Sequence, residues 1–434
     1  MSTRQFNPRA IAEFLVLAIC TVTCLFTTMG VITALFGLGA AGSRDFVEYW
    51  ASAHQLLHHA DPYSSSAILK LEQSAGHPSD LPALVMGNPP PALPLVLPLG
   101  LFGPQIGESL WLLVLSACLV ASVQVIRTMH GRPKNLLHVL GLSFAPALIC
   151  LLTGQVSLFI LLGLVLFLRL LRSHPFWAGA SLWFCLLKPH LFLPFGAVLL
   201  LWIFLTRSYR VLAGTTSALA VSSIVITIID PLVWTQYVQM MHLQRLDRLL
   251  MPSLGPTLRF YISPHTMWLQ CLPAALGCVW AIAFYLKRRH EWDWIEDGSI
   301  LMLVSLFVAP YSFLYDQPVL IPALLHRAYR THSRTLLSIL ALSSAVIEIA
   351  VLCHLDMYSV FYLWTAPAWV IWYLCAARLG SSSSQRNLSL QGGEGKRKEH
   401  SQLSGNAAPV VETAVSHTIG AITIPVKRSC SFDA

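Results

Sequence analysis

The sequence predicts an all-α, polytopic membrane protein with about 12 or 13 transmembrane helices. The 434-residue chain is 55% hydrophobic and 11% charged, whereas soluble domains carry about 25% charged residues. Several apolar runs reach the roughly 18–20 residues that a spanning helix requires. Lys and Arg form short clusters between these runs, as the positive-inside rule expects of cytoplasmic loops. The net charge of +8 is therefore no indication of nucleic-acid binding.

The first predicted span is the apolar run from Ile11 to Phe36, and Arg4 and Arg9 before it predict a cytoplasmic N-terminus. The run is longer than the core of a signal peptide and lacks a convincing cleavage site, so we expect it to stay as an anchor. Further spans are expected at about 107–127, 136–153, 156–171, 174–188, 190–206, 211–229, 266–286, 299–315, 317–328, 335–354 and 358–378.

The segment Asn88–Pro104 decides between 12 and 13 spans. Its prolines leave few consecutive helical residues, so it is predicted to be either a re-entrant piece or a short span buried in protein. The charge clusters at 287–290 and 326–334 are expected to be cytoplasmic. The loops at about 42–106 and 230–265 are then outside.

One transmembrane domain is predicted over residues 1–379. After Arg378 the chain becomes rich in Ser, Gly and charge and loses its apolar periodicity. This composition predicts a disordered cytoplasmic tail over residues 380–434. The ten cysteines are scattered without the spacing of a metal or redox motif, so no metal site is predicted.

The stretch Ser43–Tyr63 is predicted to be an amphipathic helix in the first outer loop. Phe46 and Trp50 belong to its apolar face, and Asp45 and Glu48 belong to the other. Beside a span, such a helix is expected to lie in the membrane interface, with both acids at the mouth of a helix bundle. Asp45 is predicted to be a catalytic base, and Glu48 to support it or to contact an acceptor. The alternative is that both acids only solvate the polar face.

Polar residues also stand at the predicted outer ends of later spans. Gln155 opens the run QVSLFILL, and Lys188 and His190 lie in LLKPH. A cation in an apolar run is costly and is usually functional or paired. Lys188 is therefore predicted to hold an anionic lipid phosphate as a point charge. A lysine at the outer end of a span can also simply extend to the interface, and this alternative stays open.

Two further outer segments carry candidate residues. APYSFLYDQP presents Tyr315 and Asp316, although an acid shortly before a proline is also typical of a helix-end turn. The loop over 230–265 carries several arginines and aromatic residues, which suit a phosphate group and a sugar face. Interfacial anchoring would also explain them. The candidate arginines are Arg245, Arg248 and Arg259.

Taken together, these motifs resemble the GT-C superfamily of membrane glycosyltransferases. They look most like the bacterial polyprenyl-phosphate-mannose-dependent alpha-mannosyltransferases. The resemblance rests on DFVEYWASAHQLLHHADPY, NPPPALPLVLPL, GQVSLFILL, LLKPH and PYSFLYD, which follow in the family's order over about residues 45–320. The chain departs from the family at Asn88, where an aromatic often stands, at Ala309, where Ser is common, and at Tyr315, where His is common. These departures affect the expected identity of the donor sugar more than the expected reaction class.

The resemblance implies an enzyme that moves a sugar, expected to be mannose, from a polyprenyl-phosphate-sugar donor to a lipid, glycan or protein acceptor. The transfer would be inverting, with Asp45 taking the acceptor proton and cations stabilising the leaving phosphate. From the chemistry that such a transfer requires, the candidates for binding the donor phosphate or sugar are Lys188, Gln155, one or more of Arg245, Arg248 and Arg259, and Tyr315 and Asp316. Glu48 and His190 are candidates for a supporting or acceptor-binding role.

The same resemblance implies no metal and no cofactor besides the polyprenyl-phosphate-sugar co-substrate. It also implies a multi-pass protein of the cell membrane, expected to be a bacterial inner membrane, with its active site facing outward. The partners would be membrane lipid, the lipid-linked donor and a glycan or glycolipid acceptor, with no nucleic acid.

Two other classes stay open on the sequence. A lipid-linked-sugar flippase would also be polyhelical, but paired charges deep in the spans and symmetrical repeats are typical of it, and neither is apparent. A polysaccharide ligase or polymerase would act on a lipid-linked oligosaccharide and usually has a larger outer loop late in the chain.

Overall fold

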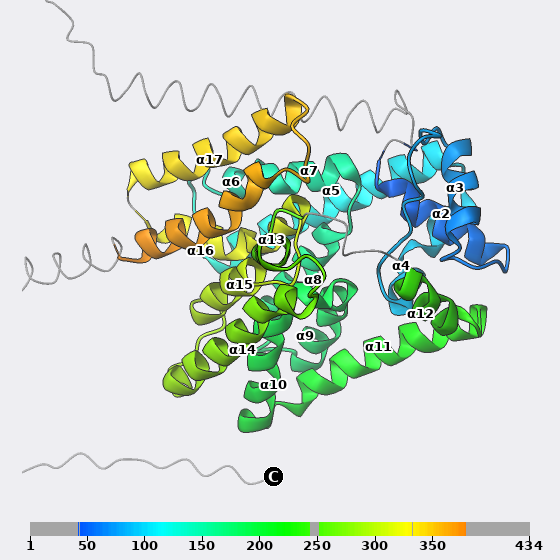
Figure 1. The fold of residues 1–434 in the computed structure, drawn as a ribbon. Helices are drawn as coiled ribbons and strands as arrows, with labels where there is room; N and C mark the ends of the chain where they lie inside the picture. The colour runs from blue at the N-terminus through cyan, green and yellow to red at the C-terminus, as the bar shows by residue number, and fades with distance from the viewer. Residues whose placement is uncertain (1–41, 43, 244–250, 332, 379–434) are drawn as a thin grey trace, which may run out of the picture. The chain divides into compact units, whose positions relative to one another are not determined.

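The computed structural model describes residues 42, 44–243, 251–331 and 333–378 (Figure 1). The chain divides into two units, Met1–Gly380 and Ser381–Ala434, and all described residues belong to the first. These residues form helices and loops without a strand, which confirms the predicted all-α class. The predicted first span and the predicted C-terminal tail lie outside the described residues.

Six helices of the described part are long and apolar enough to cross a membrane, and each overlaps a predicted span. They are α5 (Pro104–Met129), the segment Pro189–Thr206 that ends in α10 (Leu193–Thr206), α11 (Tyr209–Ile229), α14 (Trp268–Arg288), α17 (Arg334–Leu352) and the helix Val360–Arg378. At most 44% of each apolar window is buried inside the protein, which leaves an apolar face for lipid. These helices support a multi-pass membrane protein.

Four more predicted spans coincide with shorter apolar helices: α7 (Ala145–Thr153), α8 (Ser157–Leu170), α9 (Pro175–Ser181) with the 3₁₀-helix η4 (Leu182–Leu187), and α15 (Asp297–Phe307). The predicted span at 317–328 differs. It is occupied by η7 (Leu314–Leu320) and α16 (Ile321–Arg330), whose last turn carries Arg327 and Arg330. The number of crossings, 12 or 13, therefore stays a prediction.

Helix α8 forms the centre of the packing. Most of its residues are apolar and buried on every side, as expected of a helix without a polar face. It packs against α5, α9, η4 and η7. Because its first residue, Ser157, directly follows a polar turn, this central helix also fixes the position of that turn.

The proline-rich segment after Asn88 does not form a continuous helix. It consists of η2 (Pro90–Ala92), α4 (Leu93–Val96) and η3 (Leu97–Leu101), as its prolines predict. The pieces α4 and η3 pack against α2 (Phe46–Leu57). Gly100 makes that contact possible, because a Cβ there would lie 2.7 Å from the Ala53 carbonyl carbon.

Helix α2 is the amphipathic helix predicted in the first loop. It packs against α3 (Ser65–Ser74), α4, α5 and η3. Protein therefore covers part of its polar face as well as its apolar face. Ser52, one helical turn after Glu48 on the polar face, is fully buried, and Trp50 Nε1 donates to the Phe102 carbonyl at 2.9 Å. Surrounding segments of the same chain bury residues that were expected to face solvent.

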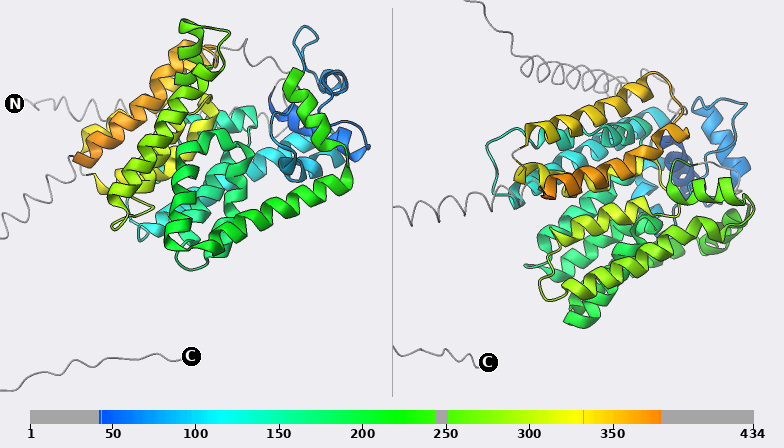
Figure 2. Two further views of the ribbon diagram at one scale, coloured as in Figure 1. Left: turned by 60° about the horizontal axis from the view of Figure 1, so that its bottom comes forward. Right: turned by 60° about the vertical axis from the view of Figure 1, so that its left-hand side comes forward.

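Helix α11 joins this region to the rest of the molecule. It contacts η2 and α4, and α12 (Val233–Leu243) follows it and contacts η2 (Figure 2). The Tyr237 ring on α12 lies 5.4 Å from the Tyr63 ring. The two segments predicted to form outer loops are thus neighbours in space.

Two glycines allow α9 and α11 to pack with their backbones in close approach. A Cβ at Gly179 would overlap the Val211 carbonyl oxygen, and a Cβ at Gly214 would overlap the Phe176 carbonyl oxygen. Thr215 Oγ1 donates to the Gly179 carbonyl at 2.8 Å. Small residues are typical of such close helix contacts in membranes.

We expect Gly179→Ala to destabilise the protein by about 1–3 kcal/mol, because the added methyl group forces the two backbones apart. Gly196→Ala is the matched control, since a Cβ there meets nothing within 4 Å and alanine favours the helix. Thermal unfolding in detergent measures both variants. Equal melting temperatures would contradict a tight α9–α11 contact.

Candidate active site

The polar turn between α7 and α8 positions Gln155. Helix α7 ends in Gly154, whose φ of 77° is left-handed, a conformation that glycine adopts without strain. A Cβ at Gly154 would lie 2.8 Å from Cβ of Phe46, and the Gly154 carbonyl accepts a 2.6 Å hydrogen bond from Trp111 Nε1. The turn therefore presses against the first residue of α2, beside Asp45.

Gln155 joins both acids of the first loop to a cation. Its Nε2 donates to Asp45 Oδ2 at 2.9 Å and to Glu48 Oε1 at 3.4 Å. Its Oε1 accepts from Tyr49 Oη at 2.8 Å and from Lys188 Nζ at 3.2 Å. These contacts allow one orientation of the amide, with its donor toward the carboxylates and its acceptor toward the hydroxyl and the ammonium.

Lys188 lies at a break between η4 and η5 (Pro189–Phe192). Its backbone is non-helical, with φ −137° and ψ 71°, as the following proline requires. Asn88 holds this break, because its Nδ2 donates to the Leu187 carbonyl at 2.8 Å. The Lys188 side chain is therefore fixed beside Gln155 although no continuous helix carries it.

Asp316 on η7 neutralises Lys188. Lys188 Nζ lies 2.7 Å from Asp316 Oδ1, and the two side chains are 12% and 1% exposed. Ser157 Oγ donates to the same oxygen at 2.9 Å, and the Phe313 amide donates to Oδ2 at 2.9 Å. The ammonium also lies 4.9 Å from the centroid of the Tyr315 ring. The ammonium, the hydroxyl and the amide thus satisfy both oxygens of this buried carboxylate.

Stacked aromatic rings border the ion pair. The His190 ring stacks on Tyr311 with centroids 3.9 Å apart, and Phe313 stacks on Tyr315 at 5.0 Å. These rings present apolar faces beside the charges of Lys188 and Asp316. The structure therefore places His190 and Tyr315 on the same side of the bundle as Lys188.

The two acids differ in their electrostatic environment. Burial raises the pKa of Asp45, while the hydrogen bond from Gln155 and the charge of Lys188 oppose that rise. Burial and the charge of Asp45 raise the pKa of Glu48 to about 8. Both pKa values are therefore raised, and Glu48, with a pKa of about 8, is a candidate for a protonated acid at neutral pH.

Of the three candidate arginines, Arg259 lies in the described part of the chain. Arg245 and Arg248 lie outside the described residues. Arg259 is buried on α13 (Leu254–Ile262), and its Nη1 donates to the Pro264 carbonyl at 2.9 Å. The start of α13 borders the site, because Ser253 Oγ accepts a hydrogen bond from the Ser312 amide at 3.2 Å. The phosphate-binding role of all three arginines stays a prediction.

Three residues of the network were not predicted from the sequence: Tyr49, Ser157 and Asn88. Tyr49 follows Asp45 by one helical turn, and Ser157 follows Gln155 by two residues, so proximity to a candidate was the only available signal. In the sequence, Asn88 stands out only as the start of the proline-rich segment and as a departure from the family pattern. Single hydroxyls and amides are common in helices and turns, which is why composition alone does not select them.

The family model of glycosyltransferase family 87 matches residues 87–310. The chain belongs to glycosyltransferase family 87. This is a GT-C-type membrane family, which confirms the predicted superfamily and makes the protein a membrane glycosyltransferase. No curated protein and no solved structure matches the chain. The family match contains Gln155, Lys188 and His190, whereas Asp45 and Asp316 lie on either side of it. The structure brings all five of these residues together.

We expect Lys188→Met to destabilise this family 87 protein by about 3–5 kcal/mol, because it leaves the carboxylate of Asp316 buried without its cation. The double variant Lys188→Met/Asp316→Leu should recover much of that loss. Lys70→Met is the matched control, because Lys70 is exposed on α3 and its replacement should change stability by no more than about 0.5 kcal/mol. Thermal unfolding that is equal for Lys188→Met and Lys70→Met would contradict the buried ion pair.

The raised pKa of Glu48 predicts a pH-dependent stability. Between pH 4.5 and about 8 the folded protein holds a proton that the unfolded chain has released, so the free energy of unfolding falls as the pH rises. Glu48→Gln cannot titrate, and its melting temperature should fall less than that of the wild type across this window. Asp45 acts in the same direction, so some slope should persist. Glu291→Gln, at an exposed position, is the control and should follow the wild type. If the melting temperature of Glu48→Gln falls with pH as steeply as that of the wild type, Glu48 is not protonated in the folded protein.

Proposed function

We propose that this glycosyltransferase transfers mannose from a polyprenyl-phosphate-mannose donor to a lipid, glycan or protein acceptor at the outer face of the cell membrane. The observation that carries the proposal is the hydrogen-bonded series Asp45–Gln155–Lys188–Asp316. It sets a carboxylate and an ammonium on the two ends of a single amide. An inverting transfer from a lipid phosphate requires a base and a cation of this kind.

Asp45 would act as the base. The acceptor hydroxyl oxygen forms a bond to the anomeric carbon while Asp45 takes the hydroxyl proton. The bond from the anomeric carbon to the phosphate oxygen breaks, and the electron pair leaves with the phosphate. Because this is one displacement from the opposite face of the sugar, the anomeric configuration inverts.

Lys188 would stabilise the phosphate that leaves. An ammonium has three donor hydrogens, and two of them are engaged by Gln155 and Asp316 at 3.2 and 2.7 Å. The third contact, to Ser157 Oγ at 3.5 Å, is long. A phosphate oxygen could replace Ser157 there without breaking the ion pair to Asp316.

Glu48 and the stacked rings would hold the sugar. A Glu48 that keeps its proton at neutral pH can donate a hydrogen bond to a hydroxyl oxygen, which a carboxylate cannot do. The ring pairs His190–Tyr311 and Phe313–Tyr315 provide apolar faces beside it. In this arrangement Asp45 removes the proton and Glu48 positions the acceptor or donor.

The distribution of basic residues supports an outward-facing site. Helices α5, α8, α10 and α14 end in or are directly followed by Arg127, Arg169, Arg207 and Lys287. The Asp45 network lies at the opposite ends of α8 and α10. Under the positive-inside rule the basic ends are cytoplasmic, so the network would face the outside, where a lipid-linked donor rather than a soluble nucleotide sugar is available.

The test is a transfer assay on the purified full-length protein with radiolabelled polyprenyl-phosphate-mannose and a membrane lipid extract. The corresponding glucose and arabinose lipids and a lipid-linked oligosaccharide serve as competing donors. Mannosylated product from the monosaccharide donor supports the proposal. Product from the oligosaccharide alone would replace it with a ligase or polymerase function, and movement of the donor across the membrane without product would indicate a flippase.

We expect Asp45→Asn to lower the transfer rate by about 10²–10⁴-fold, because the amide cannot accept the acceptor proton. Asp80→Asn is the matched control, since Asp80 is an exposed acid of the same loop and its replacement should leave the rate unchanged. The wild-type elution profile on size exclusion establishes that each variant is folded. A fully active Asp45→Asn would remove Asp45 from the mechanism.

A further inference from the structure

A second polar site lies at the ends of α8 and α10 that point away from Asp45. A cavity of about 760 Å³ is lined by the end of α8, the start of α9, the turn between α10 and α11, and residues 292–295. Its volume falls within the roughly 300–1,000 Å³ of ordinary ligand pockets. The Asp45 network contributes no residue to it.

The lining of this cavity carries four guanidinium groups and one carboxylate. The arginines are Arg169, Arg172, Arg207 and Arg210, and the acid is Asp293. Arg172 Nη2 lies 3.2 Å from Asp293 Oδ2, while the other three arginines make no ion pair with any residue that the structure describes. The cavity therefore has an excess of positive charge.

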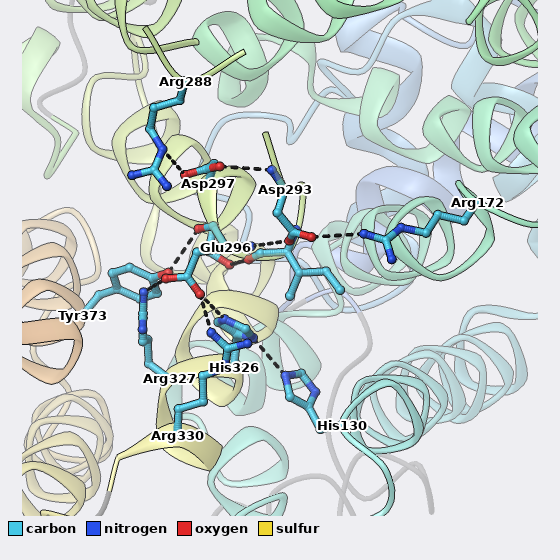
Figure 3. Close-up of polar contacts among 12 residues, drawn as sticks. His130, Arg172, Arg288, Asp293, Glu296, Asp297, His326, Arg327, Arg330 and Tyr373 are labelled. Atoms are coloured by element: carbon cyan, nitrogen blue, oxygen red, sulfur yellow. Dashed lines mark hydrogen bonds and ion pairs between the residues drawn. The ribbon is translucent and has the colours of Figure 1, made fainter. Parts of the chain in front are cut away.

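Glu296 and Asp297, which directly follow the cavity residues 292–295 in the chain, are engaged by cations outside the cavity. Glu296 pairs with His326, Arg327 and Arg330, and His326 is in turn hydrogen-bonded to His130 at 2.9 Å (Figure 3). Asp297 pairs with Arg288 at 2.9 Å. Asp293 itself accepts from the amides of residues 295 and 296. Asp293 therefore balances only Arg172, and Arg169, Arg207 and Arg210 form no ion pair in the described part of the chain. An anionic ligand would neutralise these three arginines.

Two indole groups form part of the cavity wall. Trp292 and Trp294 line the cavity, and the Nε1 of each is buried without an acceptor in the described part of the chain. Trp294 is only 7% exposed. Because neither N–H group is accessible from the cavity, the two indoles contribute apolar wall and no hydrogen bond to a ligand.

The helices beside the cavity carry exposed apolar residues near this end of the bundle. Leu200, Phe204 and Leu205 on α10 and Trp177 on α9 are exposed, close in sequence to the cavity residues Trp202, Arg207 and Pro175. Exposed apolar residues at the end of a spanning helix face lipid. A ligand with a phosphate in the cavity and acyl chains along α10 would meet both surfaces.

We propose that this cavity binds the phosphate head group of an anionic membrane phospholipid. Basic pockets between transmembrane helices on the cytoplasmic side bind such head groups, and arginine suits phosphate because its donors engage two oxygens at once. The exposed apolar residues of α9 and α10 near this end favour a lipid over free phosphate. The inference uses none of the Asp45 network and does not depend on the proposed donor or acceptor.

The test uses the full-length protein, delipidated in neutral detergent and titrated with phosphatidylglycerol, with phosphatidylcholine or with inorganic phosphate. Native mass spectrometry measures the bound lipid. The wild type should bind phosphatidylglycerol more tightly than phosphatidylcholine. Arg169→Gln/Arg210→Gln should weaken phosphatidylglycerol binding by about tenfold or more, because each charge-assisted contact is worth at least that factor.

Lys287→Gln/Arg289→Gln is the matched control. It removes the same charge from exposed positions at the same end of the bundle, outside the cavity lining, and should bind phosphatidylglycerol as the wild type does. If the arginine variant does not fold, Ser173→Glu takes its place in the binding measurement. Ser173 is an exposed cavity residue, and the added carboxylate should repel the lipid and weaken its binding. Equal phosphatidylglycerol binding by cavity variant and control overturns the proposal. Displacement of the lipid by equimolar inorganic phosphate would assign the cavity to a soluble anion instead.

Discussion

The candidate active site depends on the amide of Gln155, which holds two carboxylates and an ammonium in contact inside a largely apolar helix bundle. Charges removed from water are stable only when each has a partner. Gln155 meets this requirement from its two ends, with a donor toward Asp45 and Glu48 and an acceptor toward Lys188. Asp316 completes the arrangement by neutralising Lys188. The mechanism we propose uses the same contacts that make the site stable.

Each part of this network lies where a helix is interrupted. Gln155 follows the left-handed Gly154, Lys188 precedes a proline between two 3₁₀-helices, and Asp316 lies on the 3₁₀-helix η7. At membrane depth, irregular backbone is tolerated where protein buries it or where it lines a cavity. Breaks in helices also free backbone groups and turn side chains toward one another. The apolar helices therefore serve as supports, and the chemistry is placed at their interruptions.

The two ends of the bundle carry different electrostatics. One end holds the acid pair with its neutralised lysine, and the other holds arginine-rich loops and the cavity near Asp293. In a membrane this asymmetry orients the protein, because basic segments stay on the cytoplasmic side. It also separates two chemically distinct surfaces, for which we propose sugar transfer at one and binding of an anionic lipid at the other.

The sequence by itself determined the all-α class, the positions of six long apolar helices and the broken helix after Asn88, because hydrophobic run length and proline act locally. It also selected Asp45, Gln155 and Lys188, since polar residues are conspicuous beside apolar runs. Only the tertiary structure decided which atoms meet. Gln155 and Asp45 are 110 residues apart, and Lys188 and Asp316 are 128 apart. Contacts over such separations depend on how helices pack, and no local pattern encodes them.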